Sequence, residues 1–142
     1  MTTAQHDNKI TIVVDAELPA GLAANTAAVL ALTLGHQIES LMGPEVKDGD
    51  GNTHPGITTV PMPILTADKD KVKQIRSSAA DQRDVGLFIV DFTDCAQQTR
   101  TYDDYTRRLE VAAEKDMTYL GIALHGPRKP IQRLTGSLPL LR

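Results

Sequence analysis

Unbroken runs of apolar residues mark the strands that the sequence predicts most strongly. Residues 10–14 (ITIVV) and 86–90 (GLFIV) lack the alternation of polar and apolar positions that a half-exposed strand shows. Runs of this kind are typical of strands covered on both faces. We therefore expect both strands inside a sheet, with residues 86–90 at its centre. Residues 118–124 predict a further strand.

Two features between residues 46 and 65 predict less regular β-structure. Residues 46–54 favour a small hairpin that turns at two Asp-Gly pairs. Residues 57–65 predict a strand that contains Pro61 and Pro63. Because proline has no N–H to donate, we expect this strand at a sheet edge or with a bulge.

Helical spacing of apolar residues begins at Leu22, and Gly35 is the predicted end of that helix. The alanines of this segment allow it to lie close to a sheet. Asp68 is the predicted N-cap of a second helix over residues 69–80, whose lysines and aspartates we interpret as a solvent face. Thr101 starts a third helix with a capping-box-like pattern. The predicted buried stripe of that helix is Tyr102, Tyr105, Leu109 and Ala112.

Strands and helices alternate along the chain without a repeat or a linker. A short helix is predicted over residues 129–134, before an apolar tail over residues 137–142. We expect this tail to pack back on the domain or on a second subunit, because it is too apolar to extend into water. The expected organisation is a frayed N-terminus over residues 1–8 and a single α/β domain over residues 9–142. Its predicted architecture is three-layered, with a small mixed sheet.

Charge and composition argue against several classes of protein. The formal net charge of −3 argues against general binding of nucleic acids. No apolar run approaches the roughly 20 residues that span a bilayer, and residues 1–8 lack the apolar core of a signal peptide. Cys95 is the single cysteine, which suits a reducing compartment. We therefore expect a cytoplasmic protein without a membrane partner.

The sequence predicts no metal site and no cofactor. Asp48, Asp50 and Asn52 match the first ligand positions of a calcium loop, but Thr53 and Thr59 stand where that loop needs glycine and glutamate. The four histidines are dispersed along the chain. The single cysteine has no histidine near it in sequence, and we interpret it as a small buried hydrophobe.

Asp91 is the strongest candidate for chemistry. It follows the predicted strand over residues 86–90, and ligands of α/β sheets bind outside the carboxyl ends of strands. A carboxylate there can act as a general base, or it can cap the following turn. Thr93 either adds a hydroxyl beside Asp91 or serves as a turn former.

An amide and two cations complete the candidate site residues. Asn25 lies early in an aliphatic helix, where it either donates to a substrate carbonyl or ties the helix to the preceding turn. Arg128 and Lys129 belong to a segment, residues 117–142, with basic residues from residue 128 onward and no acid after Met117. They either contact an anion or form a solvated basic face.

Motifs along nearly the whole chain resemble a bacterial family, the domain-of-unknown-function family two thousand. They are IVVD at residues 12–15, PAGLAAN at 19–25, HPGI at 54–57, VDFT at 90–93, YLG at 119–121, GPRK at 126–129 and LTGSLPLL at 134–141. That family in turn resembles the archaeal and eukaryotic type of peptidyl-tRNA hydrolase. The resemblance implies a three-layer α/β/α sandwich with a four-stranded mixed sheet.

The same resemblance implies positions for catalytic residues. Asn25 falls where those hydrolases have a glutamine, and Asp91 falls on their aspartate after the third strand. Their helix-start lysine aligns with Gly21, so a positive charge is missing at that position. We therefore expect a ligand-binding or regulatory relative with a polar pocket around Asn25 and Asp91.

Two alternatives belong to other functional classes. One is a hydrolase of a peptidyl-tRNA-like ester or amide, with Asp91 as the base. The other is an oligomeric scaffold. The expected partners are a small ligand or a peptidyl-tRNA-like substrate, together with a second copy of the chain in a homodimer.

Overall fold

The computed structural model describes residues 7–142, which fold around a four-stranded mixed sheet in the order β4-β1-β6-β5. β1 runs parallel to β4 and antiparallel to β6, and β5 runs antiparallel to β6. The strands are β1 (Asn8–Asp15), β4 (Ile64–Ala67), β5 (Phe88–Thr93) and β6 (Tyr119–Pro127).

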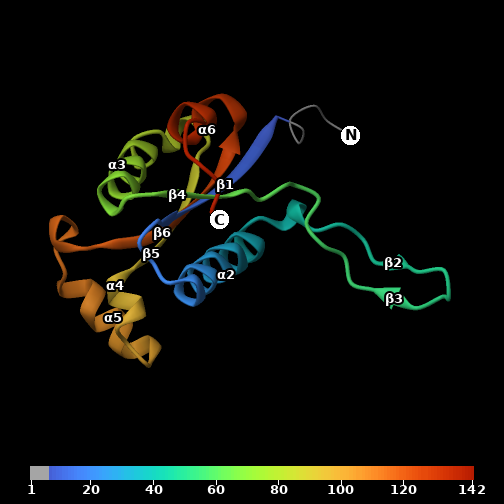
Figure 1. Ribbon diagram of the computed structural model, residues 1–142, viewed down its shortest axis with the longest axis horizontal. Helices are drawn as coiled ribbons and strands as arrows, with labels where there is room; N and C mark the ends of the chain where they lie inside the picture. The colour runs from blue at the N-terminus through green and yellow to red at the C-terminus, as the bar shows by residue number, and fades with distance from the viewer. Residues whose placement is uncertain (1–6) are drawn as a thin grey trace.

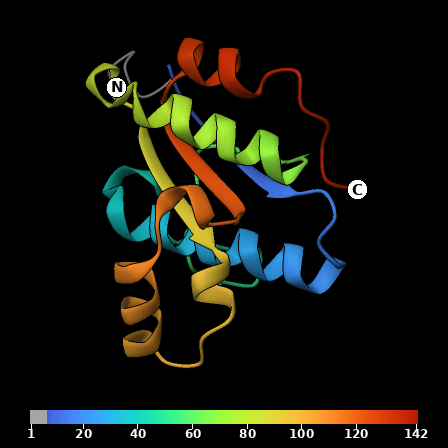
Figure 2. The same cartoon turned by 90° about the vertical axis from the view of Figure 1, so that its left-hand side faces the viewer.

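Helices cover both faces of this sheet, so the predicted three-layer α/β/α architecture is confirmed (Figures 1 and 2). Helix α2 (Ala20–Gln37) lies on one face. Helices α3 (Lys69–Ala80) and α6 (Arg128–Thr135) lie on the other face. The remaining helical segments are α4 (Asp94–Gln97), α5 (Tyr102–Val111) and the short 3-10 helices η1 (Glu39–Leu41), η2 (Arg83–Val85) and η3 (Glu114–Asp116).

Alternate side chains of β1 enter two separate cores. Ile10, Ile12 and Val14 pack under α2, whereas Val13 packs under α3 and α6. Helix α2 lies close to the sheet at Gly121, where an added Cβ would stand 2.7 Å from Cγ2 of Thr26. The small residues of α2 thus permit the close packing that the alanine-rich sequence predicts.

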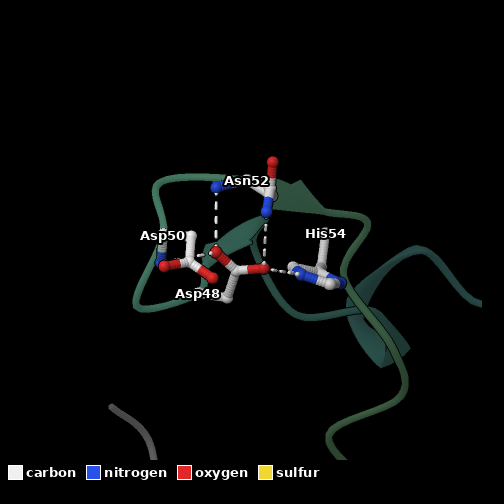
Figure 3. A network of polar contacts seen from close by, with 4 residues as sticks. All are labelled: Asp48, Asp50, Asn52 and His54. Atoms are coloured by element: carbon white, nitrogen blue, oxygen red, sulfur yellow. Dashed lines mark hydrogen bonds and ion pairs between the residues drawn. The ribbon is translucent and has the colours of Figure 1, made fainter.

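A hairpin of β2 (Val46–Lys47) and β3 (Thr53–His54) extends away from the sandwich (Figure 1). Asp48 organises its turn, because the carboxylate accepts hydrogen bonds from the backbone N–H groups of Asp50 and Asn52 and from the Asn52 side chain. Nε2 of His54 lies 2.8 Å from Oδ2 of Asp48, the oxygen that also accepts from the Asn52 side chain, whereas both backbone N–H groups donate to Oδ1 (Figure 3). The hairpin prediction is therefore confirmed. Within residues 7–142, no group of three or more metal-ligating side chains is gathered.

The C-terminal tail packs against the outer edge of β4. The N–H of Thr66 donates to the carbonyl of Pro139 at 2.9 Å, and the N–H of Leu141 donates to the carbonyl of Ile64 at 2.8 Å. Leu138 packs against the core under α3 and α6. The two predicted packing partners of the tail are the domain itself and a second subunit. The structure shows the tail packed on the domain itself.

The expected position of one strand is wrong. Residues 86–90 are predicted at the centre of the sheet, but β5 is an edge strand and begins only at Phe88. α2 and α3 contact its two faces but leave Ile89, Val90 and Phe92 only partly buried and Phe88 36% exposed, so an apolar run does not distinguish a central strand from an edge strand. Asp91 accordingly lies inside the strand instead of after it.

Two element boundaries and the burial of one helix also differ from the prediction. Gly35 does not end α2, which continues to Gln37 because nothing crowds the glycine and its φ is helical. Residues 57–63 are not a strand, because the prolines leave only Ile64–Ala67 to pair with β1. Helix α5 has no fully buried residue, and Tyr102 is 79% exposed, since this helix stands at the end of the sheet instead of on its face.

Most of the predicted N-terminal segment, residues 1–6, lies outside the described residues, and Asn8 already belongs to β1. In the part of the chain that the structure describes, no helix has the length and apolar character needed to cross a bilayer.

Candidate functional site

A cavity of about 430 Å³ lies beside the open edge of β5, between α2 and the α4–α5 region. Its walls combine apolar and aromatic side chains with a few polar groups. It is lined by Val29 and Thr33 of α2, by Val90, Asp91 and Phe92 of β5, and by Ala96, Thr99, Arg100, Thr101, Tyr102 and Tyr105.

Asp91 is the one acidic residue among these, and a cation from another element stands beside it. Nε of Arg76, on α3, lies 3.5 Å from Oδ2 of Asp91. This distance makes an ion pair, although the Nε–H has no hydrogen-bond partner within residues 7–142. The Arg76 guanidinium also lies over the ring of Tyr119, 5.4 Å from its centre. The ring and the carboxylate together position the guanidinium.

Two tyrosines near this pair are held in their protonated forms. Burial raises the pKa of Tyr119 to about 12, and its hydroxyl donates to Oε1 of Glu114 across 3.4 Å. Burial also raises the pKa of Tyr105, and the negative charge of Asp91 adds to this effect. Both side chains therefore stay neutral to a higher pH than an ordinary tyrosine does.

The structure does not bring Asn25 or Thr93 into this cavity. Asn25 is exposed on α2, one helical turn before Val29, so the expected pocket around both Asn25 and Asp91 contains Asp91 only. Thr93 is 2% exposed and does not line the cavity. At the register shift between Phe92 and Thr93, Leu120 of β6 has no partner on β5, so the pairing beside Asp91 is irregular.

Arg128 and Lys129 lie in a different part of the molecule. They begin α6 and line a cavity of about 510 Å³ together with Asp7, Pro127, Pro130 and Arg133. Asp91 pairs with Ile122 of β6. Arg128 lies six residues after Ile122, just beyond the end of β6 at Pro127. At about 3.3 Å per residue this is a separation of roughly 20 Å. The two cations therefore do not face the Asp91 cavity.

Sequence reasoning misses Arg76. The interpretation of the lysines and aspartates of α3 as a solvent face leaves out Arg76, whose side chain is only 23% exposed. A signal does exist: Val72, Ile75, Arg76 and Ala79 have the spacing i, i+3, i+4 and i+7, which places Arg76 within the buried stripe. Its partner Asp91 belongs to another element, and the spacing does not reveal it.

Fold and cavity together define a class: a small α/β/α sandwich with a mixed four-stranded sheet and a cavity at its open edge. The model of a family described as "Protein of unknown function (DUF2000)" matches residues 8–142. The chain therefore belongs to the DUF2000 family, as its motifs indicate.

A solved structure with the same fold is that of the protein of unknown function Atu0240 from Agrobacterium tumefaciens strain C58. It has 19% sequence identity and a TM-score of 0.83, and the match covers 94% of this chain and 97% of that chain. At this identity the likeness concerns the fold alone. A comparison with curated proteins gives no match.

Proposed function

We propose that this protein is a ligand-binding domain whose site is the cavity at the edge of β5. The observation that carries the proposal is the presence of one carboxylate, that of Asp91, in a largely apolar and aromatic cavity. Binding sites for small molecules commonly combine apolar walls with few polar groups that orient the ligand. In this role Asp91 accepts a hydrogen bond from an amine or a hydroxyl group of the ligand.

The neighbouring Arg76 supports this role. Its guanidinium, 3.5 Å from the carboxylate, balances the charge of Asp91 on the side that faces α3. The carboxylate is 30% exposed and keeps acceptor capacity for a second partner.

A screen of small fragments by ¹H–¹⁵N NMR tests the proposal. Fragments that carry an amine or a hydroxyl on an apolar group are expected to shift the amides of residues 90–92 and 102–105. Asp91→Asn is expected to weaken their binding about tenfold, the worth of one hydrogen bond to a charged group. Asp103→Asn is the matched control, because Asp103 is exposed and does not line the cavity. The absence of any fragment that shifts these amides would contradict the proposal, as would equal effects of the two variants.

A second candidate function is hydrolysis of an ester or amide, such as that of a peptidyl-tRNA-like substrate, with Asp91 as the base. Arg76 favours it, because the family resemblance calls for a cation near the carboxylate that Gly21 does not provide. Against it, Asn25 is exposed and lies outside the cavity, so its amide is poorly placed to donate a hydrogen bond to a substrate carbonyl there.

Deacylation of peptidyl-tRNA by the purified protein distinguishes the two functions. If the protein is a hydrolase, the Asp91→Asn and Arg76→Gln variants lose the deacylase activity of the unmodified protein. If it is a binding domain, the unmodified protein shows no more activity than the Asp91→Asn variant. A rate that is measurable but equal in all three proteins would remove Asp91 from the role of base.

A further inference from the structure

A second cavity adjoins the first at the connection between α4 and α5. It has a volume of about 420 Å³ and is lined by Gln98, Thr99, Arg100, Asp104, Arg107 and Arg108. Thr99 and Arg100 line both cavities, so the two share a wall. A ligand that extends past these two residues therefore reaches from one cavity into the other.

Positive charge dominates this second cavity, which contains three arginines and one aspartate. Nη1 of Arg108 donates to Oε1 of Gln98 at 2.8 Å, so a neutral amide orients this guanidinium and leaves its charge unbalanced. Nη2 of Arg107 lies 3.7 Å from Oδ1 of Asp104, and both side chains are more than half exposed. An exposed pair of this kind is weak, so the aspartate does not neutralise the cluster.

Arg100 stands at the shared wall and forms no ion pair with another residue of the range 7–142. Its guanidinium carries five N–H donors in a planar fork, a geometry that suits oxyanions. Arg100 is thus placed to contact an anionic group at the junction of the two cavities.

The first cavity offers little for an anion. The hydroxyl of Thr33 donates to the carbonyl of Val29, that of Thr99 donates to the carbonyl of Cys95 in α4, and Oγ1 of Thr101 accepts the N–H of Asp104. Asp91 is itself negative. What remains is an apolar and aromatic wall formed chiefly by Val29, Phe92 and the two tyrosines, whose rings contact each other edge to face with centres 5.4 Å apart. This wall suits a flat apolar group.

We propose that the two cavities bind one ligand, an aromatic phosphate monoester, with its ring in the first cavity and its phosphate among Arg100, Arg107 and Arg108. Three guanidinium groups match the charge of a phosphate dianion better than that of a single carboxylate. This inference rests on the proposed binding function of the first cavity and adds the chemical class of the ligand.

Three probes test it in ¹H–¹⁵N NMR titrations of the full chain: 1-naphthyl phosphate, 1-naphthol and inorganic phosphate. The ester is expected to bind at least about tenfold more tightly than either half and to shift the amides of residues 90–92 and 98–108. Arg100→Gln is expected to remove the advantage of the ester over 1-naphthol. Arg83→Gln changes the charge equally and is the matched control, because Arg83 lines neither cavity.

Each contrary outcome has a distinct meaning. Equal binding of 1-naphthol and its phosphate, with shifts at residues 90–92, would overturn the phosphate assignment and leave the binding function of the first cavity intact. Binding of inorganic phosphate as tight as that of the ester would overturn the joint site. Shifts confined to residues 127–133 would place the anion at α6 and overturn the inference. Binding of none of the probes would also overturn it, and the fragment screen would then decide the binding function independently.

Discussion

At the scale of single residues, Asp91 owes its environment to groups that are distant in sequence. Its carboxylate lies beside Arg76 of α3, and its charge adds to the effect of burial in raising the pKa of Tyr105 of α5. The same strand carries Thr93, two residues later, which is buried and outside the cavity. The type of a residue in a strand therefore indicates little about its chemistry until the residues that other elements place beside it are known.

Asp48 provides a prediction at this scale. Hydrogen bonds to its carboxylate, first that of His54, lower its pKa from 3.8 to about 2 (Figure 3). Because the pKa is lowered in the folded hairpin, the stabilisation is present above the ordinary pKa of 3.8 and is lost as the pH falls through about 2. An NMR titration of the side-chain carboxyl is expected to show a midpoint near 2.

Replacing the hydrogen-bond partner checks the cause. His54→Ala is expected to move the Asp48 midpoint upward toward 3.8, since the largest contribution to the shift is removed. His36→Ala, on α2, serves as the control and is expected to leave the midpoint unchanged. An Asp48 midpoint that stays near 2 in His54→Ala would show that the backbone N–H groups suffice.

At the scale of elements, the two edges of the sheet are treated differently. The C-terminal tail hydrogen-bonds to the outer side of β4, whereas β5 pairs with β6 alone among the described strands. An uncovered edge presents unpaired backbone groups. It also leaves space between α2 and α5, and the Asp91 cavity occupies this space.

The tail gives a prediction about stability. Leu138→Ala is expected to lower the free energy of unfolding by about 1–2 kcal/mol, because this half-buried side chain packs against the core. Leu140→Ala is expected to change it by less than about 0.5 kcal/mol, since that side chain is 52% exposed. Urea denaturation measures both. Equal effects of the two variants would mean that the tail contributes through its backbone pairing only.

At the scale of the whole molecule, the expected homodimer requires an interface other than the apolar C-terminal tail, which the sequence suggests for this role. The backbone of the apolar tail already pairs with β4 of its own chain, and Leu138 packs against the core under α3 and α6. The open edge of β5 remains, with Phe88 and the nearby Val85 partly exposed. A second copy that covers only the start of this edge, at Val85 and Phe88, would bury both side chains and leave the cavity at residues 90–92 open.

Light scattering coupled to size-exclusion chromatography tests this prediction. The protein is expected to elute with twice the mass of one chain, and Phe88→Lys is expected to shift it to a monomer, because a charge on an edge strand disfavours pairing. Leu32→Lys places the same charge on an exposed position of α2 and is the control. A monomeric mass for the unmodified chain would contradict the prediction and the scaffold alternative together.

Local patterns in the sequence are enough for most of the elements. The N-caps at Asp68 and Thr101 are found as predicted, each accepting a backbone N–H from the first turn of its helix. The hairpin turn at Asp48 and the helix Lys69–Ala80 are equally local in origin. Apolar periodicity and capping chemistry act over a few residues, so they can be interpreted without knowledge of the rest of the chain.

Strand order and the composition of the cavity follow from tertiary structure alone. Whether an apolar run becomes a central or an edge strand depends on which segments pair beside it, and β5 has a partner on one side only. The ion pair between Arg76 and Asp91, and the first cavity with its lining from α2, β5 and α5, join residues from separate elements. Long-range packing sets these juxtapositions, and no spacing along the chain encodes them.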